Sequence, residues 1–442
     1  MEKASDSIEK IRQQFDYAPY PRKPLDYYPT DIQLLYIHSL VTPYYMRSQK
    51  VPETEGKVIL DAGCGSGYKS LALAVANPGA TIVGIDLSEN SVNLAKQRLH
   101  YHGFTNTEFH VLAIEDLPKL GKEFDYINAD EVLYLLPNIA SGLQAMKSVL
   151  KPEGIIRTNL HSSLQRKNYF TAQKVFKMMG LMDENPGELE IDVVRETMKA
   201  LKEDVFLKAR TWRPEHEQEE EWFLMNYLFQ GDTGYTVQEM FAALRAAELE
   251  FINMVRWPHW ELTDLFQEPD NLPVFLGMNL PELSQEQRLH LFELLHPVHR
   301  LLDFWCAHPP AGNPPLPIAD WTISDWEAAL VHLHPVLKTP QVKQEMVDSV
   351  TNLKMLEIAR FLPFVKQPTL FMDSTAVACL LPLFDGRQSM NSLLQRWLQV
   401  KPLDPVTLEP TPLNKAGETL QQMLITWEQL GLILLEPQSA KD

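Results

Sequence analysis

A glycine-rich segment, DAGCGSG at residues 61–67, constrains the fold of this chain more than any other feature. It follows the short apolar run KVIL and precedes GYKSLALAVANPG, whose apolar residues have helical spacing. Gly63, Gly65 and Gly67 allow the backbone to turn sharply out of a strand and to approach a ligand closely. The segment therefore predicts a strand, a ligand-binding turn and a helix in immediate succession.

Strand-like and helix-like segments alternate from Lys57 to about Leu160. ATIVGID, TEFHVLA, FDYINA and GIIRTNL are further apolar runs, and helical SENSVNLAKQRLHYHG and PNIASGLQAMKSVLKPEG lie among them. A capping-type Ser88 begins the first of these helices, and Gly103 ends it. Continuous apolar strands alternating with helices predict an α/β fold, a Rossmann-like doubly wound parallel sheet with ligands at the carboxyl ends of its strands.

Asp86 ends the second predicted strand, nineteen residues after Gly67. An acid at this place can accept hydrogen bonds from both ribose hydroxyls, so the ligand is expected to be adenosine-like. The loop has the spacing G-x-G-x-G and lacks the lysine and hydroxyl pair of phosphate-binding loops. Asp61 and Asp86 together would repel a pyrophosphate and suit a cationic amino-acid end.

These motifs resemble those of class I S-adenosylmethionine-dependent methyltransferases over residues 57–160. VILDAGCGSG is similar to their first motif, IVGIDLS to the second, AIEDLP to the third, and FDYI with VLYLLPN and VLKPEG to the fourth and fifth. The resemblance implies S-adenosylmethionine as the cofactor. It further implies that Asp61 and the glycine loop hold the methionine moiety, and that Asp86 holds the ribose.

The adenine contacts implied by the resemblance involve Leu87, Ile114 and Glu115. Ala113 stands where the family commonly has an acid, so the adenine contact falls to Glu115 or Asp116. The complete set of residues expected at the cofactor is Asp61, Gly63, Cys64, Gly65, Gly67, Asp86, Leu87, Ile114, Glu115 and Asn128.

A narrower resemblance involves FDYAPYPRKPL near the N-terminus and YTVQEMFAALRAAELEF after residue 234. Both are similar to bacterial methyltransferases with a Tyr-Pro-Tyr-Pro-like N-terminal motif, some of which methylate protein side chains. Ala18 departs from that pattern, and EVLYLL replaces the usual GVLHHL. Tyr17, Tyr20 and Arg22 are expected either to fold over the cofactor or to form an ordinary proline-bounded turn.

Polar residues at the end of the fourth predicted strand, NADE at 128–131, are the candidate catalytic groups. In this fold the strand borders the transferred methyl group, where acidic or amide side chains can orient a nucleophile or take its proton. Asn128, Asp130 and Glu131 are therefore the predicted catalytic residues. The alternative is that Asp130 and Glu131 cap a helix near Val132. Asn128 is followed by Ala129, so the Asn-Pro-Pro-Tyr signature of many N-methyltransferases is absent.

Three histidines are weaker candidates. His161 ends the fifth strand and is a candidate acid or base, although a lone histidine is more often structural. His296 and His299 lie one turn apart on a predicted helix without acid or cysteine partners. No metal site is expected.

The length of 442 residues predicts more than one domain. We expect cap helices at 1–50 and a methyltransferase domain at 51–262, with an insertion at about 161–230 that forms a lid or a plain helical outgrowth. Residues 263–442 are expected to be mainly helical, with a winged-helix-like module from about 360.

The composition of the chain disfavours two classes of binding partner. The formal charge of −18 disfavours nucleic acid, and no apolar run is long enough for a membrane span. Three cysteines and a polar N-terminal segment fit the cytoplasm. The oligomeric state is open.

The leading function is a methyltransferase acting on a protein that the lid and C-terminal region select. The alternatives are a small-molecule methyltransferase with a dimerising C-terminal domain, and a non-catalytic scaffold that binds the cofactor.

Overall fold

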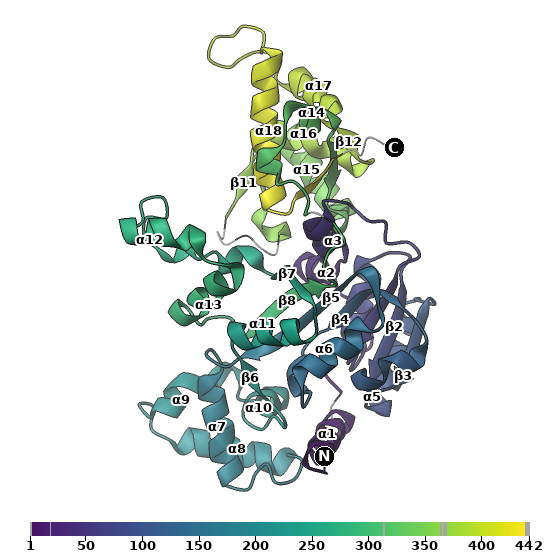
Figure 1. The fold of residues 1–442 in the computed structure, drawn as a ribbon, viewed down its shortest axis with the longest axis vertical. Coiled ribbons are helices and arrows are strands. Elements are labelled where there is room, and N and C mark those ends of the chain that lie inside the picture. The colour runs from purple at the N-terminus through teal and green to yellow at the C-terminus, as the bar shows by residue number, and fades with distance from the viewer. Residues whose placement is uncertain (1, 18, 313, 363–364, 366–368, 438–442) are drawn as a thin grey trace.

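A mostly parallel sheet forms the centre of the molecule (Figure 1). The computed structural model describes residues 2–17, 19–312, 314–362, 365 and 369–437, and their side chains except those of 2–8 and 17. Eight strands follow the order β3-β2-β1-β4-β5-β8-β7, with β6 paired to β5, which confirms the predicted Rossmann-like fold. The strands are β1 (Val58–Ala62), β2 (Thr81–Asp86), β3 (Thr107–Val111), β4 (Phe124–Ala129), β5 (Leu150–Ser162), β6 (Gly234–Tyr235), β7 (Glu250–Met254) and β8 (Leu301–Ala307).

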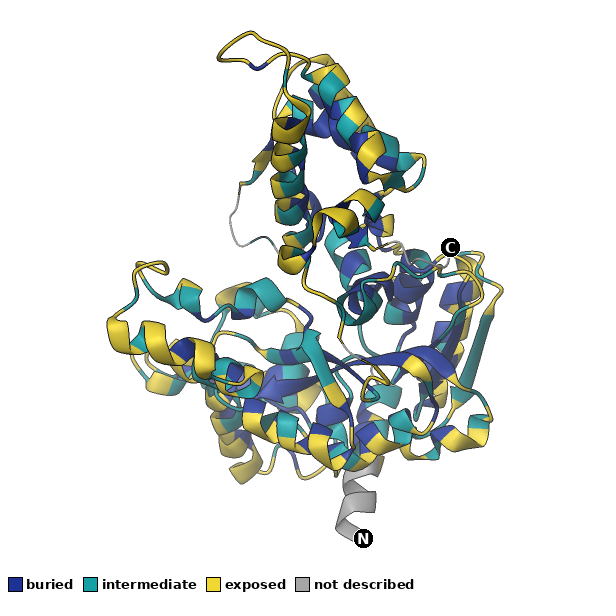
Figure 2. Ribbon diagram, turned by 45° about the horizontal axis from the view of Figure 1, so that its top comes forward, coloured by how far each residue is buried: buried dark blue, intermediate teal, exposed yellow. Residues whose placement is uncertain are grey.

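Successive apolar residues of the central strands pack on opposite faces of the sheet. Ile59 and Ile82 belong to a core shared with α3 (Val41–Ser48) and α4 (Tyr68–Ala76), next to α5 (Glu89–Tyr101). Leu60 and Val83 belong to the opposite core, shared with α6 (Ile139–Lys147) and α11 (Val237–Ala246). Because side chains alternate across a strand, a sheet covered on both faces requires an apolar residue at every position. Figure 2 shows this sheet as a buried layer.

Helices begin where the capping residues predict. The Ser88 hydroxyl accepts a hydrogen bond from the Ser91 amide at 3.0 Å, which starts α5. Thr236 and Glu239 form a reciprocal capping box at the start of α11, and Ser284 and Gln287 form another at α13 (Gln285–Leu295). Each pair satisfies backbone amides that a helix start otherwise leaves without partners.

Strand β8 corrects two sequence-based predictions. The apolar run that follows α13 is a strand, antiparallel to both β5 and β7, and not a continuation of the helix. Pro297 follows the end of α13, and a short apolar run by itself fits a buried strand as well as a helix. The boundary predicted at residue 262 is therefore wrong, since the methyltransferase sheet extends to Ala307.

The arm of α12 (Val274–Asn279) and α13 lies between β7 and β8 in the chain and projects beside the sheet (Figure 1). His296 caps the end of α13, and His299 lies beyond it, stacked on Trp260 with ring centroids 4.3 Å apart. The prediction that these two histidines lie one turn apart on one helix is thus wrong.

Residues between β5 and β6 form a helical insertion. It contains α7 (Lys167–Met178), α8 (Glu188–Ala200), α9 (Phe206–Thr211) and α10 (Glu220–Asn226). Phe176, Val194 and Phe223 are fully buried in a core of its own. Because the insertion leaves the sheet at the carboxyl end of β5, it stands beside the ligand edge of the sheet (Figure 1).

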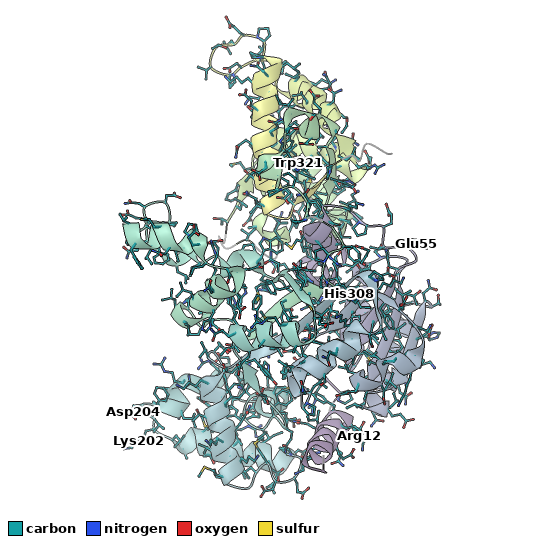
Figure 3. All side chains as sticks on the ribbon, viewed as in Figure 1. Arg12, Glu55, Lys202, Asp204, His308 and Trp321 are labelled. Carbon is teal, nitrogen blue, oxygen red and sulfur yellow. The ribbon has the colours of Figure 1, made fainter. Side chains whose placement is uncertain are left out.

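The C-terminal module has a separate core, which includes Trp321 and Trp397 (Figure 3). Its elements are α14 (Ile323–Ala328), β9 (Leu330–Leu333), α15 (Pro340–Thr351), β10 (Leu356–Glu357), β11 (Phe371–Met372), α16 (Ser374–Leu380), β12 (Gln388–Ser389), α17 (Met390–Val400), α18 (Leu413–Gln429) and β13 (Ile433–Glu436). Helices α16, α17 and α18 are followed by strand β13, and the winged-helix likeness stays a prediction. Within the described ranges, no helix is both long and apolar enough to cross a membrane.

The N-terminal helices contact two different parts of the molecule. Helix α2 (Ile32–His38) and α3 connect the sheet to the C-terminal module: Tyr36 donates to the Gly431 carbonyl at 2.6 Å, and Tyr45 donates to Glu428 at 2.9 Å. Helix α1 (Glu2–Tyr17) lies at the other end of the molecule, near α5, and Lys10 donates to the Asp183 carbonyl of the insertion at 2.7 Å (Figure 1).

Candidate active site

The glycine loop turns tightly between β1 and α4. Gly65 and Gly67 have φ values of +49° and +79°, in the left-handed region that favours glycine. A Cβ on Gly65 would lie 2.3 Å from the Tyr20 carbonyl oxygen, and one on Gly67 would lie 2.5 Å from the Ala95 Cα. The loop therefore needs glycine at both positions for backbone conformation and for close packing.

The N-terminal PYPR segment packs directly on this loop. The Ser66 amide donates to the Tyr20 carbonyl at 2.9 Å, and its hydroxyl donates to the Pro21 carbonyl at 2.8 Å. Arg22 pairs with Glu220 of α10 at 3.1 Å and thereby points toward the insertion. Of the three residues predicted to fold over the site, Tyr20 does so, Arg22 does not, and the Tyr17 side chain lies outside the described residues.

A cavity of about 150 Å³ lies beside the loop at the carboxyl ends of β1, β2 and β4, and we call it the loop cavity. Its lining includes the polar side chains of Tyr20, Asp86 and Glu131. Residues of helix α1 also line it. Its lining residues are Ile11, Arg12, Phe15, Tyr20, Gly63, Gly65, Asp86, Leu87, Leu112, Ala113, Ile114, Glu115, Asp130, Glu131, Val132, Leu135 and Leu136.

Most of the predicted cofactor residues reach this cavity. Gly63, Gly65, Asp86, Leu87, Ile114 and Glu115 line it, whereas Asp61, Cys64, Gly67 and Asn128 do not. Of the two acids left open by the sequence, Glu115 lines the cavity and Asp116 pairs with Lys119 at 2.8 Å. The α1 residues Ile11 and Phe15 were not predicted, although their four-residue spacing is an apolar helical signal.

Asp86 holds the loop in place. Its carboxylate oxygens accept hydrogen bonds from the Gly65 amide and the Ser88 amide, both at 2.9 Å. Burial raises the pKa of Asp86, and these two backbone amides oppose the rise. The carboxylate thus stands at the cavity with two of its acceptor positions already used, leaving others for a ligand.

Asp61 and Asn128 lie beneath the loop cavity. Asp61 is buried and accepts from the Ser70 hydroxyl at 2.6 Å and from the Asn128 amide nitrogen at 2.9 Å. Arg157 donates to the Asn128 oxygen at 3.1 Å, so both ends of the Asn128 amide are engaged. Burial raises the pKa of Asp61 to about 6. Asn128 therefore orients Asp61 in this structure and is not placed to touch an acceptor, contrary to its predicted role.

Asp130 is the centre of a buried ion-pair network. Lys69 of α4 lies 2.5 Å from its carboxylate, and Asn159 of β5 donates to it at 2.6 Å. Arg157 lies 3.7 Å away and also pairs with Asp303 of β8 at 2.8 Å. Burial opposes ionisation, but Lys69 and Arg157 hold the pKa of Asp130 well below its usual range. These cations therefore hold Asp130 as a buried carboxylate anion.

Glu131 stands at the end of β4 in an unusual backbone conformation. Its φ is +61°, and its amide donates to the Asn159 oxygen at 2.8 Å. Non-glycine residues with such φ values concentrate at functional sites. The carboxylate pairs with Arg300 and accepts from the Tyr20 hydroxyl at 3.2 Å. Burial opposes ionisation, but Arg300 lowers the pKa of Glu131.

The capping alternative for this strand end is wrong. A short helical turn at Leu133–Leu135 follows, and its capping position is Val132, with no side-chain cap bond. Asp130 and Glu131 make their contacts with other elements of the fold. Neither carboxylate therefore caps this helical turn.

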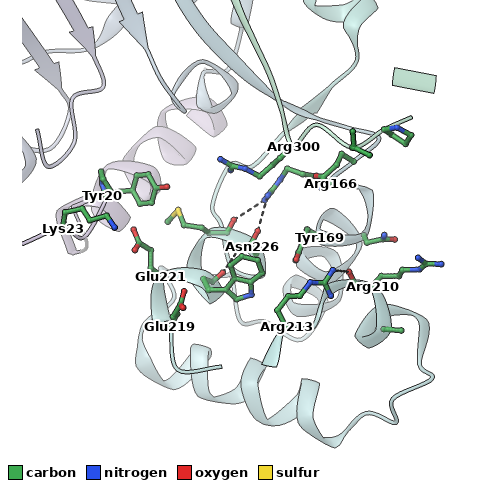
Figure 4. Close-up of a pocket in the computed structure, with 18 residues that line it drawn as sticks. Tyr20, Lys23, Arg166, Tyr169, Arg210, Arg213, Glu219, Glu221, Asn226 and Arg300 are labelled. Carbon is green, nitrogen blue, oxygen red and sulfur yellow. Dashed lines mark hydrogen bonds between the residues drawn. The ribbon is translucent and has the colours of Figure 1, made fainter. Parts of the chain in front are cut away.

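A second cavity of about 830 Å³, the insertion cavity, adjoins the first. Tyr20 lines both, and Arg300 lines the second while it pairs with Glu131 of the first. Figure 4 shows Lys23 and Glu221 on one side and Arg210 and Arg213 on the other. Its lining residues are Tyr20, Pro21, Lys23, Gln165, Arg166, Asn168, Tyr169, Ala209, Arg210, Arg213, Glu219, Glu221, Trp222, Met225, Asn226, Pro297, Val298 and Arg300.

Known proteins resemble this chain in sequence and fold. Residues 53–230 match the family model of a methyltransferase domain. An uncharacterized protein of Synechococcus sp. is 28% identical over 338 residues, which are 75% of this chain and 77% of that protein. A ubiquinone biosynthesis O-methyltransferase of Thiobacillus denitrificans is 37% identical over 120 residues, 26% of this chain and 49% of the enzyme, so the match spans about half of that relative.

A solved structure shares the fold over nearly the whole chain. PKMT2 from Rickettsia typhi, in complex with AdoHcy, gives a TM-score of 0.61 at 16% identity and covers 95% of this chain and 78% of its own. The sheet, the glycine loop and the match to the family model thus define residues 53–230 as a class I S-adenosylmethionine-dependent methyltransferase domain. Its cofactor is S-adenosylmethionine. The narrower likeness to methyltransferases with a Tyr-Pro-Tyr-Pro-like motif stays a prediction.

Proposed function

We propose that this methyltransferase acts on a protein acceptor, which enters through the insertion cavity. The observation that carries the proposal is the position of this cavity: it is about 830 Å³ in volume and meets the loop cavity at Tyr20, beside Glu131. Val298 lines this cavity and is 50% exposed, and Phe206, whose ring contacts the lining residue Arg210, is 66% exposed. Exposed apolar side chains at a cavity mouth suit a large partner that covers them.

The cofactor residues proposed from the sequence fit the loop cavity. Gly63 and Gly65 would bring the backbone close to the methionine moiety, with Asp61 beneath them and Asp86 at the ribose. Leu87 and Ile114 supply the apolar walls for adenine, and Glu115 its polar edge. When bound, the cofactor supplies an electrophilic methyl group on its sulfonium.

Glu131 and Tyr20 would orient the acceptor nucleophile. Both face the junction of the two cavities, and they are hydrogen-bonded to each other. Because Arg300 lowers the pKa of Glu131, the carboxylate stays ionised and acts as a hydrogen-bond acceptor more than as a strong base. Positioning of the nucleophile is then the main contribution of these residues to the rate.

Helix α1 would move when the cofactor enters. The loop cavity, at about 150 Å³, is smaller than the roughly 300 Å³ at which ligand pockets begin. Ile11, Arg12 and Phe15 of α1 close its outer side. An outward shift of α1 would enlarge the cavity without disturbing the sheet.

Asp86→Ala is expected to weaken S-adenosylmethionine binding by about 10- to 150-fold, the worth of hydrogen bonds to a charged group. Asp86→Asn, which keeps one acceptor oxygen, should lose less. Calorimetric titration with the cofactor measures both, and Glu123→Ala, an exposed acid at the far end of β4, is the control. Binding by Asp86→Ala within twofold of the wild type would contradict the ribose assignment.

Transfer of labelled methyl groups tests the acceptor class. The protein is incubated with methyl-labelled S-adenosylmethionine and a cell lysate, and the macromolecular and small-molecule fractions are counted separately. We expect label in the protein fraction, resistant to nuclease and lost with protease. Label confined to small molecules would refute a protein acceptor.

A small-molecule acceptor is the second candidate, because the relatives that are named by activity are ubiquinone biosynthesis O-methyltransferases. They match about a quarter of this chain, so they leave the insertion cavity and the C-terminal module without a counterpart in the match. In this alternative the C-terminal module serves dimerisation.

We further propose that the protein is cytoplasmic, since Cys64, Cys306 and Cys379 are all free and buried.

A further inference from the structure

His161 takes part in a line of polar contacts that runs through Arg300 and ends at Glu131. Its Nδ1 lies 2.5 Å from the Asp232 carboxylate, and its Nε2 lies 3.1 Å from an Arg300 guanidinium nitrogen. Arg300 pairs in turn with Glu131, which accepts from Tyr20. His161 itself is 1% exposed and lines neither cavity. It is therefore not placed to exchange a proton with an acceptor.

The partners of His161 fix its tautomer. Asp232 also accepts from Arg166 at 2.6 Å and from Gln173 at 2.8 Å, and these donors stabilise it as a carboxylate. A carboxylate can only accept, so Nδ1 of His161 carries a proton and donates it. Arg300 can only donate, so Nε2 is the unprotonated nitrogen that accepts. Burial lowers the pKa of His161, which agrees with a neutral ring.

The ring is also held in its plane. Tyr134 stacks on His161 with centroids 3.9 Å apart and an interplanar angle of 21°. The imidazole lone pair therefore points in one direction, toward Arg300. A directed acceptor matters here because the Arg300 side chain is 45% exposed and would otherwise have several orientations available at the cavity wall.

We propose that His161 and Asp232 are positioning residues for methyl transfer: they hold the Arg300 guanidinium in the wall between the two cavities, so that Glu131 faces the acceptor in one orientation. This inference rests on the proposed role of Glu131. Arg166 lies where the insertion begins and Asp232 lies where it ends. Their ion pair therefore joins the two ends of the insertion. The same network thus links the seating of the insertion to the geometry of the reaction site.

Two substitutions distinguish the roles of the two ring nitrogens of His161. Asn at position 161 places its amide nitrogen near Nδ1 and keeps a donor for Asp232, but it has no acceptor near Nε2. Gln places its oxygen near Nε2 and keeps an acceptor for Arg300. Both remove the ring, so a difference between them reports on the Arg300 contact and not on the loss of the stacking.

The experiment uses the full-length protein, labelled S-adenosylmethionine and increasing amounts of one lysate protein fraction. For His161→Asn we expect the maximal rate to fall by about 10- to 100-fold, the cost of a small misplacement of a reacting group. The half-saturating amount of acceptor fraction and the cofactor affinity should stay within threefold of the wild type. His161→Gln should recover most of the rate.

His100→Asn and His100→Gln, on an exposed histidine of α5 outside both cavities, are the matched controls. Equal rates for His161→Asn and His161→Gln, whether normal or lowered together, would overturn the inference. A wild-type protein that transfers label to neither fraction would overturn the proposed function as well, and the two failures are thus distinguishable.

Discussion

Glu131→Gln is expected to lower the rate of methyl transfer by about 100-fold or more while cofactor affinity changes by less than a few-fold. Glu131 is the acid of the NADE segment whose carboxylate contacts Tyr20 and Arg300, the residues that link the loop cavity to the insertion cavity. Gln keeps the size of the side chain but removes the charge that holds Arg300 and attracts the acceptor. Since methyl transfer depends on alignment of the nucleophile, this loss falls on the chemical step.

The measurement pairs labelled methyl transfer with calorimetric titration of the cofactor. Glu123→Gln, the same change on an exposed acid just before the first residue of β4, should behave like the wild type. Transfer by Glu131→Gln at more than a tenth of the wild-type rate would show that Glu131 is dispensable. A parallel loss of cofactor affinity would instead make it a cofactor ligand.

Asp130→Asn is expected to destabilise the fold by about 3–5 kcal/mol, the usual consequence of removing one partner of a buried ion pair. Its carboxylate is 5% exposed and neutralises Lys69 and Arg157, of which Arg157 is 3% exposed. In the variant Arg157 keeps its pair with Asp303, whereas Lys69 loses its 2.5 Å partner. Asn is nearly the same size as Asp, so the loss reflects charge and not volume.

Urea titration followed by circular dichroism measures this change. The matched control is Asp116→Asn, which breaks an exposed pair with Lys119 and should cost about 0–1 kcal/mol. The pKa of Asp130 is lowered in the folded state, so its contribution is present above the unfolded value of about 3.9 and is lost as the pH falls below it. Equal free energies of unfolding for Asp130→Asn and Asp116→Asn at pH 7 would contradict the prediction that the buried ion pairs of Asp130 stabilise the fold.

Much of the sheet and the loop cavity could be predicted because their signals are local. Apolar runs, the glycine spacing and Asp86 each reflect interactions within a few residues or between adjacent strands, and most predicted cofactor residues do line the loop cavity. Strand β8 was missed because LLDFWCA is short and apolar except for Asp303, so its periodicity does not separate a strand from a helix.

The roles of the NADE residues could not be predicted, since their partners are far away in the chain. Arg300 lies 169 positions from Glu131, and Lys69 lies 61 positions from Asp130. Asn128 is just as polar in the sequence as its neighbours, yet strand alternation turns it inward, toward Asp61. Three polar residues at one strand end thus have three different sets of partners.

The sequence by itself determined the class of fold and the position of the glycine loop, because backbone turns, strand patterning and helix caps are set by neighbouring residues. The tertiary structure decided that Asp130 is a buried anion between two cations, that Glu131 pairs with Arg300, and that His161 contacts both Asp232 and Arg300. Those assignments depend on the strand order β5-β8 and on how the insertion closes through Arg166 and Asp232, and burial with specific charge partners is a property of the assembled fold.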